Sequence, residues 1–162
     1  MVYRADLTQT GEVIAVGYLA RGHSFPKGKV SEAFFHRLVA LAKEPLSFSC
    51  GYHTCDVGWC SLSLGGEHPK FRYEGDVISV GSTDILVPDN EVVYEVPSLI
   101  LHYIRHHKYV PPACFVQAVL ECPDPGSPKY IAAIKSVAPE MAQFLWPPEC
   151  TTDKDARSEK LR

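Results

Sequence analysis

The chain has no excess of positive charge and no block of lysine or arginine residues. Its 162 residues include 16 lysines and arginines against 19 aspartates and glutamates, which gives a formal net charge of −3. A broad nucleic-acid-binding surface needs clustered cations, so we expect no nucleic-acid partner. No apolar run approaches the length that spans a bilayer, and the first residues lack the apolar core of a secretory signal. We therefore expect a cytoplasmic protein that is not embedded in a membrane.

The common signatures of enzymes are also missing. The sequence contains no glycine-rich phosphate loop, no nucleophile elbow and no His-Glu-x-x-His pattern. Cys55 and His53 are close enough in sequence to form a nucleophile and base pair, but the pattern supplies no third residue to orient them. These absences favour a non-enzymatic role.

Half of the cysteines lie in one short stretch. Three of the six fall within residues 50–60, where Gly51 and Gly58 allow sharp turns. Thiols stay reduced in the cytoplasm, so the clustering favours metal binding over disulfides. A structural zinc ion takes four thiolate or imidazole ligands in a tetrahedron. The stretch therefore predicts a compact zinc knuckle with the ligand set Cys50, His53, Cys55 and Cys60.

Three histidines outside the stretch are additional candidate ligands. If Cys50 does not bind the metal, three protein ligands remain, and an open fourth position is typical of a catalytic zinc. His102 or His107, brought in from a predicted helix, would close the site instead. The simpler interpretation of these two histidines is a half-exposed polar face of that helix. His23 lies in a loop rich in glycine and proline, where it contacts a substrate or partner or simply anchors the loop.

Short apolar runs bounded by glycine and proline predict the strands. The clearest pair, residues 85–87 and 92–96, is joined by a polar turn and predicts a hairpin. The nearly continuous apolar run at 13–19 predicts a buried strand. Short strands at 46–50 and 59–64 would place the knuckle at the tip of a hairpin.

Apolar residues at helical spacing predict the helices. Ser31 and Ser127 are predicted N-caps, and Pro97 and Pro112 mark the starts of two further helices. Strands and helices together predict an α+β fold, with a small mixed or antiparallel sheet packed by three to four helices.

The length and composition fit one domain with a real core. We expect a single globular domain over residues 1–148. Residues 149–162 are charged and carry no apolar stripe, which predicts a flexible C-terminal tail.

Several motifs occur in a fixed order between about residues 13 and 122. They are Val16-Gly-Tyr-Leu, His23-Ser-Phe-Pro-Lys-Gly28, Gly51-Tyr-His53-Thr-Cys55, Ser82-Thr-Asp-Ile-Leu-Val87, Tyr94-Glu-Val-Pro-Ser-Leu-Ile-Leu-His102-Tyr-Ile, and His107-Lys-Tyr-Val-Pro-Pro112 with Phe115-Val-Gln-Ala-Val-Leu120. As a set they resemble a family of small uncharacterised bacterial proteins, common in actinobacteria, with a domain of unknown function.

The resemblance implies a small α+β domain with a metal-binding His-x-Cys element at His53 and Cys55. Members of the family place the next cysteine two residues after the counterpart of Cys55, whereas here the next one is Cys60. The family pattern has no counterpart of Cys50. The resemblance therefore raises a distant histidine as the alternative fourth ligand.

Three functions remain open at this stage. The first is a non-enzymatic, zinc-stabilised cytoplasmic protein that binds another protein, for example as an immunity or accessory protein, by analogy with other small bacterial families. The second is a metal-dependent hydrolase that uses a Cys/His zinc site. The third is a thiol-based redox or metal sensor. Four protein ligands favour the first, a metal-bound water the second, and reversible loss of metal on oxidation the third.

Overall fold

A mixed β-sheet forms the centre of the protein. The computed structural model describes residues 8–10, 13–45, 47–48, 52–58, 60 and 69–141. Within these ranges five strands pair in the order β1-β2-β7-β6-β3. Their bounds are β1 Thr8–Thr10, β2 Val13–Ala15, β7 Val93–Pro97, β6 Thr83–Pro88 and β3 Ser47–Phe48. The strands β2 and β7 run parallel, and the other neighbours run antiparallel, so the sheet is mixed.

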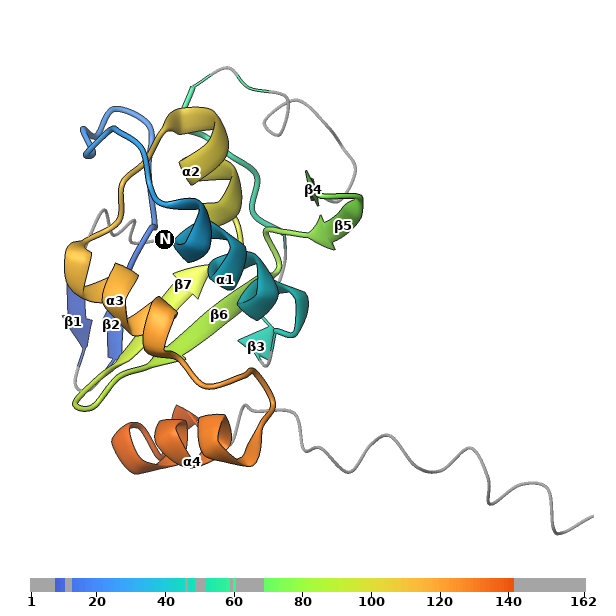
Figure 1. Ribbon diagram of the computed structural model, residues 1–162. Coiled ribbons are helices and arrows are strands. Elements are labelled where there is room, and N and C mark those ends of the chain that lie inside the picture. The colour runs from blue at the N-terminus through green and yellow to red at the C-terminus, as the bar shows by residue number, and fades with distance from the viewer. Residues whose placement is uncertain are drawn as a thin grey trace, which may run out of the picture.

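Four helices pack on this sheet in the described part of the chain. They are α1 Glu32–Lys43, α2 Ile100–His107, α3 Ala113–Glu121 and α4 Pro128–Val137. In Figure 1 α1 lies across β6 and β7, with α2 and α3 on either side of it and α4 at the opposite end of the sheet from α2. The α+β prediction, with a small mixed sheet and three to four helices, is confirmed.

The core lies between α1, α3 and the central strands. Phe34 of α1 and Tyr94 of β7 both meet the ring of Phe115 of α3 edge to face, at centroid distances of 6.1 and 5.5 Å. The hydroxyl group of Tyr130 in α4 donates a hydrogen bond to the backbone carbonyl oxygen of Leu86 in β6. Burial of such aromatic side chains is a main source of the stability of the fold.

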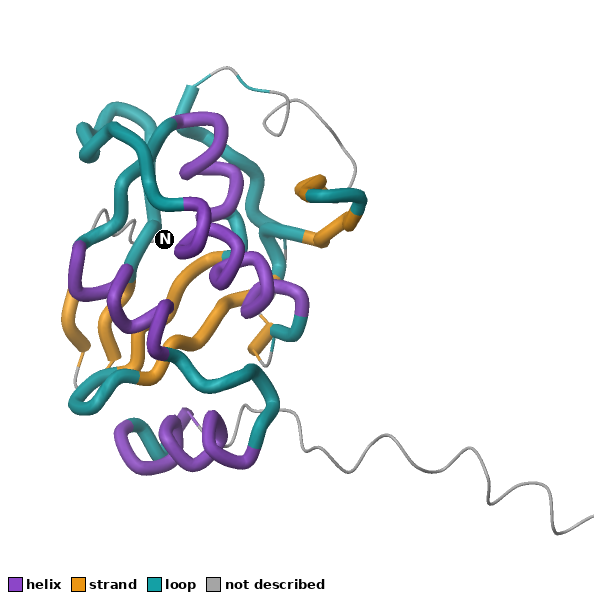
Figure 2. The backbone as a smooth tube through the Cα atoms, in the orientation of Figure 1, coloured by secondary structure: helices purple, strands orange, loops and turns teal. Residues whose placement is uncertain are grey.

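A separate two-stranded hairpin projects beside α1. It consists of β4 Lys70–Tyr73 and β5 Asp76–Ser79, and Figure 2 shows it apart from the main sheet. Its inner face carries Phe71, whose ring meets that of Phe35 on α1 at 6.0 Å. The hairpin is therefore held to the body of the protein through an aromatic contact with α1.

The starts of two helices agree with the sequence prediction. The hydroxyl oxygens of Ser31 and Ser127 accept hydrogen bonds from the backbone N–H groups of Phe34 and Tyr130, at 3.2 and 3.1 Å. Both are N-caps, as predicted. Pro97, by contrast, ends β7, and α2 begins three residues later at Ile100.

The strand predicted over residues 13–19 is shorter than expected, because β2 ends at Ala15. Gly17 has a left-handed backbone with φ +78°, and a Cβ at this position would lie 2.9 Å from Cδ1 of Ile100. The apolar run therefore leaves the extended conformation in order to pack tightly against α2. An unbroken apolar run indicates burial but does not distinguish these two backbone conformations.

Two predictions fall on residues outside the described ranges. One is the strand at 59–64 that would lead out of the knuckle, of which only Cys60 is described. The other is the flexible tail at 149–162. The incoming strand β3 pairs with β6.

Candidate metal centre

Two cysteines and two histidines from distant parts of the chain meet in one cluster. Their donor atoms, from Cys55, Cys60, His102 and His107, all lie within 4.8 Å of one another. Cys55 Sγ lies 3.2 Å from His107 Nε2, and Cys60 Sγ lies 3.5 Å from His102 Nε2. The two Nε2 atoms are 3.2 Å apart. The thiols come from the loop between β3 and β4, and its described residues 52–58 run alongside α2, the helix that carries both imidazoles (Figure 1).

The spacing of these donors fits a tetrahedral metal ion. With metal–sulfur bonds of about 2.3 Å and metal–nitrogen bonds of about 2.0–2.1 Å, tetrahedral donors lie about 3.3–3.8 Å apart. The three separations given above, 3.2, 3.2 and 3.5 Å, are close to this range. Cys55 is fully buried and His102 is 1% exposed, so the surrounding protein holds the donors in place. The cluster is compatible with a metal site.

The loop that carries the thiols is fixed to the turn between β5 and β6. The backbone N–H of His53 donates a 2.7 Å hydrogen bond to the carbonyl oxygen of Gly81. The N–H of Gly81 donates in turn to the hydroxyl oxygen of Ser98, at 2.9 Å, just before α2. These two bonds join the thiol loop to the start of the helix that carries His102. These backbone hydrogen bonds therefore help to hold the four side chains of the cluster close together.

A substitution at Gly81 tests the close approach of the thiol loop to the turn between β5 and β6. The φ of Gly81 is +90°, and a Cβ there would lie 2.2 Å from the His53 carbonyl oxygen. We expect Gly81→Ala to lower the free energy of unfolding by about 3 kcal/mol or more, because left-handed strain of about 1–2 kcal/mol adds to a backbone clash. The matched control is Gly75→Ala, since Gly75 has φ +91° but nothing within 4 Å of the added Cβ. Urea unfolding measures both, and equal losses would contradict the close approach.

The end of α2 positions His107. Lys108 terminates the helix in the left-handed conformation with φ 61°, and the N–H of Tyr109 bonds to the carbonyl oxygen of Tyr103 at 3.1 Å. The segment then pairs with the loop before α1, where the N–H of Gly28 donates to the carbonyl oxygen of Lys108 at 2.9 Å. His107 is thus held at a helix end that is braced from both sides.

Burial keeps the histidines of the cluster neutral. It lowers the pKa of His102 to about 4, with smaller contributions from the charges of His106 and His107. Burial also lowers the pKa of His107. Neutral imidazole is the form that binds metals. In His102 the nitrogen that faces the other donors is Nε2, while Nδ1 is buried without a hydrogen-bond partner.

The thiol of Cys55 has the opposite response to burial. Its pKa is raised to about 12, chiefly because burial disfavours the thiolate, while a hydrogen bond from the backbone of Val57 partly opposes this shift. A divalent cation reverses the balance, since a coordinated thiol is deprotonated outright. The cluster is thus poor at holding an isolated thiolate and suited to one that is neutralised by a metal.

The structure brings together only part of the predicted ligand set. Cys55 and Cys60 join the cluster, and the additional candidates His102 and His107 complete it. His53 is not a member: its backbone anchors the loop to Gly81. Cys50 lies outside the described residues. His23 is exposed in the loop before α1 and is not part of the cluster.

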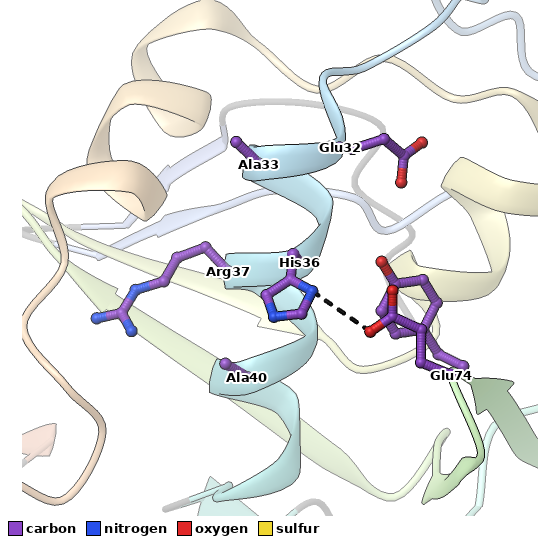
Figure 3. A pocket seen from close by; sticks show the side chains of 7 residues that line it. Glu32, Ala33, His36, Arg37, Ala40 and Glu74 are labelled. Atoms are coloured by element: carbon purple, nitrogen blue, oxygen red, sulfur yellow. Dashed lines mark ion pairs between the residues drawn. The ribbon is translucent and has the colours of Figure 1, made fainter.

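A second feature, an open hollow of about 700 Å³ on the outer side of α1, has a different character. Its lining residues are Glu32, Ala33, His36, Arg37, Ala40, Tyr73 and Glu74. Figure 3 shows His36 reaching toward Glu74 while Arg37 points the other way. The charged groups are paired at distances of 2.7–3.7 Å: Glu32 with Arg105, His36 with Glu74, and Arg37 with Asp124. Exposed pairs of this kind contribute little to stability because solvent and salt screen them, and they assemble no reactive group.

Fold and cluster together define a small α+β domain with a partly buried Cys₂His₂ group that is compatible with a metal site. A family model described as "Domain of unknown function (DUF7919)" matches residues 1–120, so the chain belongs to this family. The matched region contains all four residues of the cluster. The prediction that the chain belongs to a family of uncharacterised domains is confirmed.

The other comparisons gave no relatives. No curated protein and no solved structure is significantly similar to the chain. None of the helices in the described ranges combines the length and the apolar character that crossing a bilayer requires.

Proposed function

We propose that the protein is a non-enzymatic domain that is stabilised by one structural zinc ion and that binds another protein. The observation that carries the zinc proposal is the convergence of four donor atoms from two separate segments, all within 4.8 Å of one another. The ion would tie the loop between β3 and β4 to α2. Structural zinc sites supply folding free energy in this way.

The donor set supports zinc over other metals. Two thiolates and two imidazoles in a tetrahedron are typical of zinc or of iron–sulfur centres. A binuclear iron–sulfur cluster with two cysteines and two histidines places the two types of ligand on different irons. The 3.2 Å between Cys55 Sγ and His107 Nε2 is too short for that arrangement. Two thiolates also neutralise the charge of Zn²⁺, which suits a buried site.

A closed ligand set supports a structural role over hydrolysis. Catalytic zinc sites bind three protein ligands and keep the fourth position for water or substrate. Here four protein donors are present, and no aspartate or glutamate in the described part of the chain joins them. A hydrolase would need both an open position and a base within reach of the metal-bound water.

The cellular setting proposed is the cytoplasm of a bacterium, as the family resemblance implies. Three of the cysteines, Cys55, Cys114 and Cys122, are free thiols in the described ranges. Free thiols are usual in reducing compartments. A role as an immunity or accessory protein fits the small size of the chain and is offered by analogy.

The first test is the metal content. We expect protein purified without a histidine tag to contain about one zinc per chain by elemental analysis. A chelator should lower the melting temperature by about 10 °C, because metal at 1,000 times its dissociation constant adds about 4 kcal/mol to the free energy of unfolding. Consistently substoichiometric zinc with no gain on reconstitution would contradict the proposal.

The outer face of the β4–β5 hairpin supports the binding role. Strand alternation places Phe71 and Ile78 inward, and it leaves Arg72 and Val77 as an exposed cross-strand pair. Val77 is 50% exposed, an unusual state for a large apolar side chain in the described ranges. Arg72 and the nearby Lys70 form no ion pair with a described residue. An apolar residue flanked by unpaired cations fits an acidic surface of a partner protein.

A charge-reversed hairpin tests this surface. We expect the double variant Arg72→Glu, Val77→Asp to lose a partner that co-purifies with the wild type, from cells of its source, at about one copy per chain. The control is Leu120→Asp, which changes another exposed apolar residue, on α3 and 43% exposed. If the hairpin variant retains the partner, or if only the Leu120→Asp control loses it, the hairpin is not the binding surface. Co-purification of nucleic acid in place of a protein would do so as well.

A further inference from the structure

The two thiols of the metal centre are also arranged for oxidation. Cys55 and Cys60 lie five residues apart on one loop, with their sulfur atoms within 4.8 Å of each other. Gly58 between them has φ +109°, a backbone conformation that glycine adopts at little cost. The cysteines differ in access, because Cys55 is fully buried whereas Cys60 is partly exposed. The pair thus combines an accessible thiol with a buried partner.

We propose that the centre is an oxidation site at which a two-electron oxidant of the peroxide class converts Cys55 and Cys60 to a disulfide and releases the metal. This inference rests on the proposed function, since it assigns a regulatory reaction to the same zinc site. It goes beyond that function because a purely structural zinc site has no need to respond to oxidants.

The reaction balances in two steps. The Cys60 thiolate attacks one peroxide oxygen, the O–O bond breaks, hydroxide leaves, and Cys60 becomes a sulfenic acid. The Cys55 thiolate then attacks the sulfur of that sulfenic acid, the S–S bond forms, the S–O bond breaks, and a second hydroxide leaves. The two thiolates lose two electrons and the peroxide gains them. Protonation of both hydroxides gives water.

Loss of the two thiolates removes the metal bridge between the thiol loop and α2. Only His102 and His107 remain as donors, and both belong to the same helix. Two imidazoles are too few for the four-coordinate site of structural zinc. The new disulfide closes a ring within the loop and so makes no covalent bond to α2. Oxidation therefore frees the loop from the helix.

Two cysteines outside the cluster serve as internal controls for the oxidation of the Cys55–Cys60 pair. Cys114 is exposed at the start of α3, and Cys122 is buried at the end of the same helix. Neither belongs to the cluster. Exposure alone would make Cys114 the most oxidised residue, whereas the proposed reaction requires the Cys55–Cys60 pair to trap the oxidised state.

The experiment uses the full chain in its zinc-loaded form, as wild type and as Cys114→Ser. Zinc is counted first. Hydrogen peroxide is then added, released zinc is followed with a chromophoric chelator, and disulfides are mapped by mass spectrometry. We expect release of about one zinc per chain in step with a Cys55–Cys60 disulfide. The release should be unchanged in Cys114→Ser and reversed by dithiothreitol with added zinc.

The outcomes separate this inference from the proposed function. A chain that takes up no zinc at the loading step contradicts both. A loaded chain that keeps its zinc while Cys114 is oxidised contradicts the inference alone. A disulfide formed through Cys50 instead of Cys60 also overturns the assignment.

Discussion

Replacement of Cys55 by serine should lower the zinc affinity more than about 100-fold. Groups that only orient metal ligands change affinity by about 10- to 100-fold when removed, so loss of a direct thiolate exceeds that range. A 100-fold loss corresponds to about 2.7 kcal/mol of metal-linked stability with metal in excess. We expect the melting temperature of Cys55→Ser to fall by about 5–10 °C and to lose most of its response to chelator. Competition with a zinc indicator measures the affinity directly.

Cys122→Ser is the matched control for this experiment. Cys122 is a buried thiol, 5% exposed, at the end of α3 and outside the cluster. Its replacement should cost about 1–2 kcal/mol, the usual range for placing a hydroxyl in a buried position. Zinc affinity and the response to chelator should stay as in the wild type. If Cys55→Ser proves no worse than Cys122→Ser, the loop does not hold a structural metal.

The second large effect is expected at His102. Asparagine at this position is too short to place a donor where Nε2 now lies, so His102→Asn should also reduce zinc affinity more than about 100-fold. The ring of His106 stacks on that of His102 at 4.7 Å but is exposed and outside the cluster. His106→Asn should therefore change the affinity by no more than about threefold, since surface substitutions alter free energies by about 0.5 kcal/mol. Isothermal titration of zinc into both variants measures the difference.

Equal effects at the two histidines would contradict the assignment of Nε2 of His102 as a donor. An unchanged affinity in His102→Asn would do so too, even if Cys55→Ser loses its zinc. That combination would point back to a site formed within residues 50–60. The two pairs of variants therefore test the loop half and the helix half of the centre separately.

Local sequence signals predicted the parts of the fold that local chemistry determines. The N-caps Ser31 and Ser127 and the hairpin of β6 and β7 depend on hydrogen bonds and turns a few residues long. Cys55 and Cys60 stood out because half of the thiols lie in one stretch. Such signals need no knowledge of distant contacts.

The histidine half of the cluster depends on long-range contacts. His107 lies 52 residues from Cys55 in sequence, and His102 lies 42 residues from Cys60. Their meeting requires the β6–β7 pairing and the bonds through Gly81 that tie the loop to Ser98. No local pattern encodes those distances, so the sequence left His102 and His107 as two of several candidates.

His53 shows why proximity in sequence misleads at this site. It lies two residues from Cys55 and was a natural partner for it in a compact knuckle. In the structure its backbone N–H serves the contact with Gly81, and the imidazole is not in the cluster. Gly81 has a more specific role than turn formation, since its close approach to the His53 carbonyl oxygen requires the absence of a side chain.

X-ray absorption at the zinc edge tests the central claim most directly, because it counts the ligand types on the metal. The cluster of Cys55, Cys60, His102 and His107 requires two sulfur neighbours at about 2.3 Å and two nitrogen neighbours at about 2.0–2.1 Å, with the multiple-scattering pattern of two imidazoles. A knuckle of Cys50, His53, Cys55 and Cys60 would give three sulfurs and one imidazole. Two sulfurs with two nitrogens is the result that we expect, and three sulfurs, or a bound water in place of one imidazole, would contradict it.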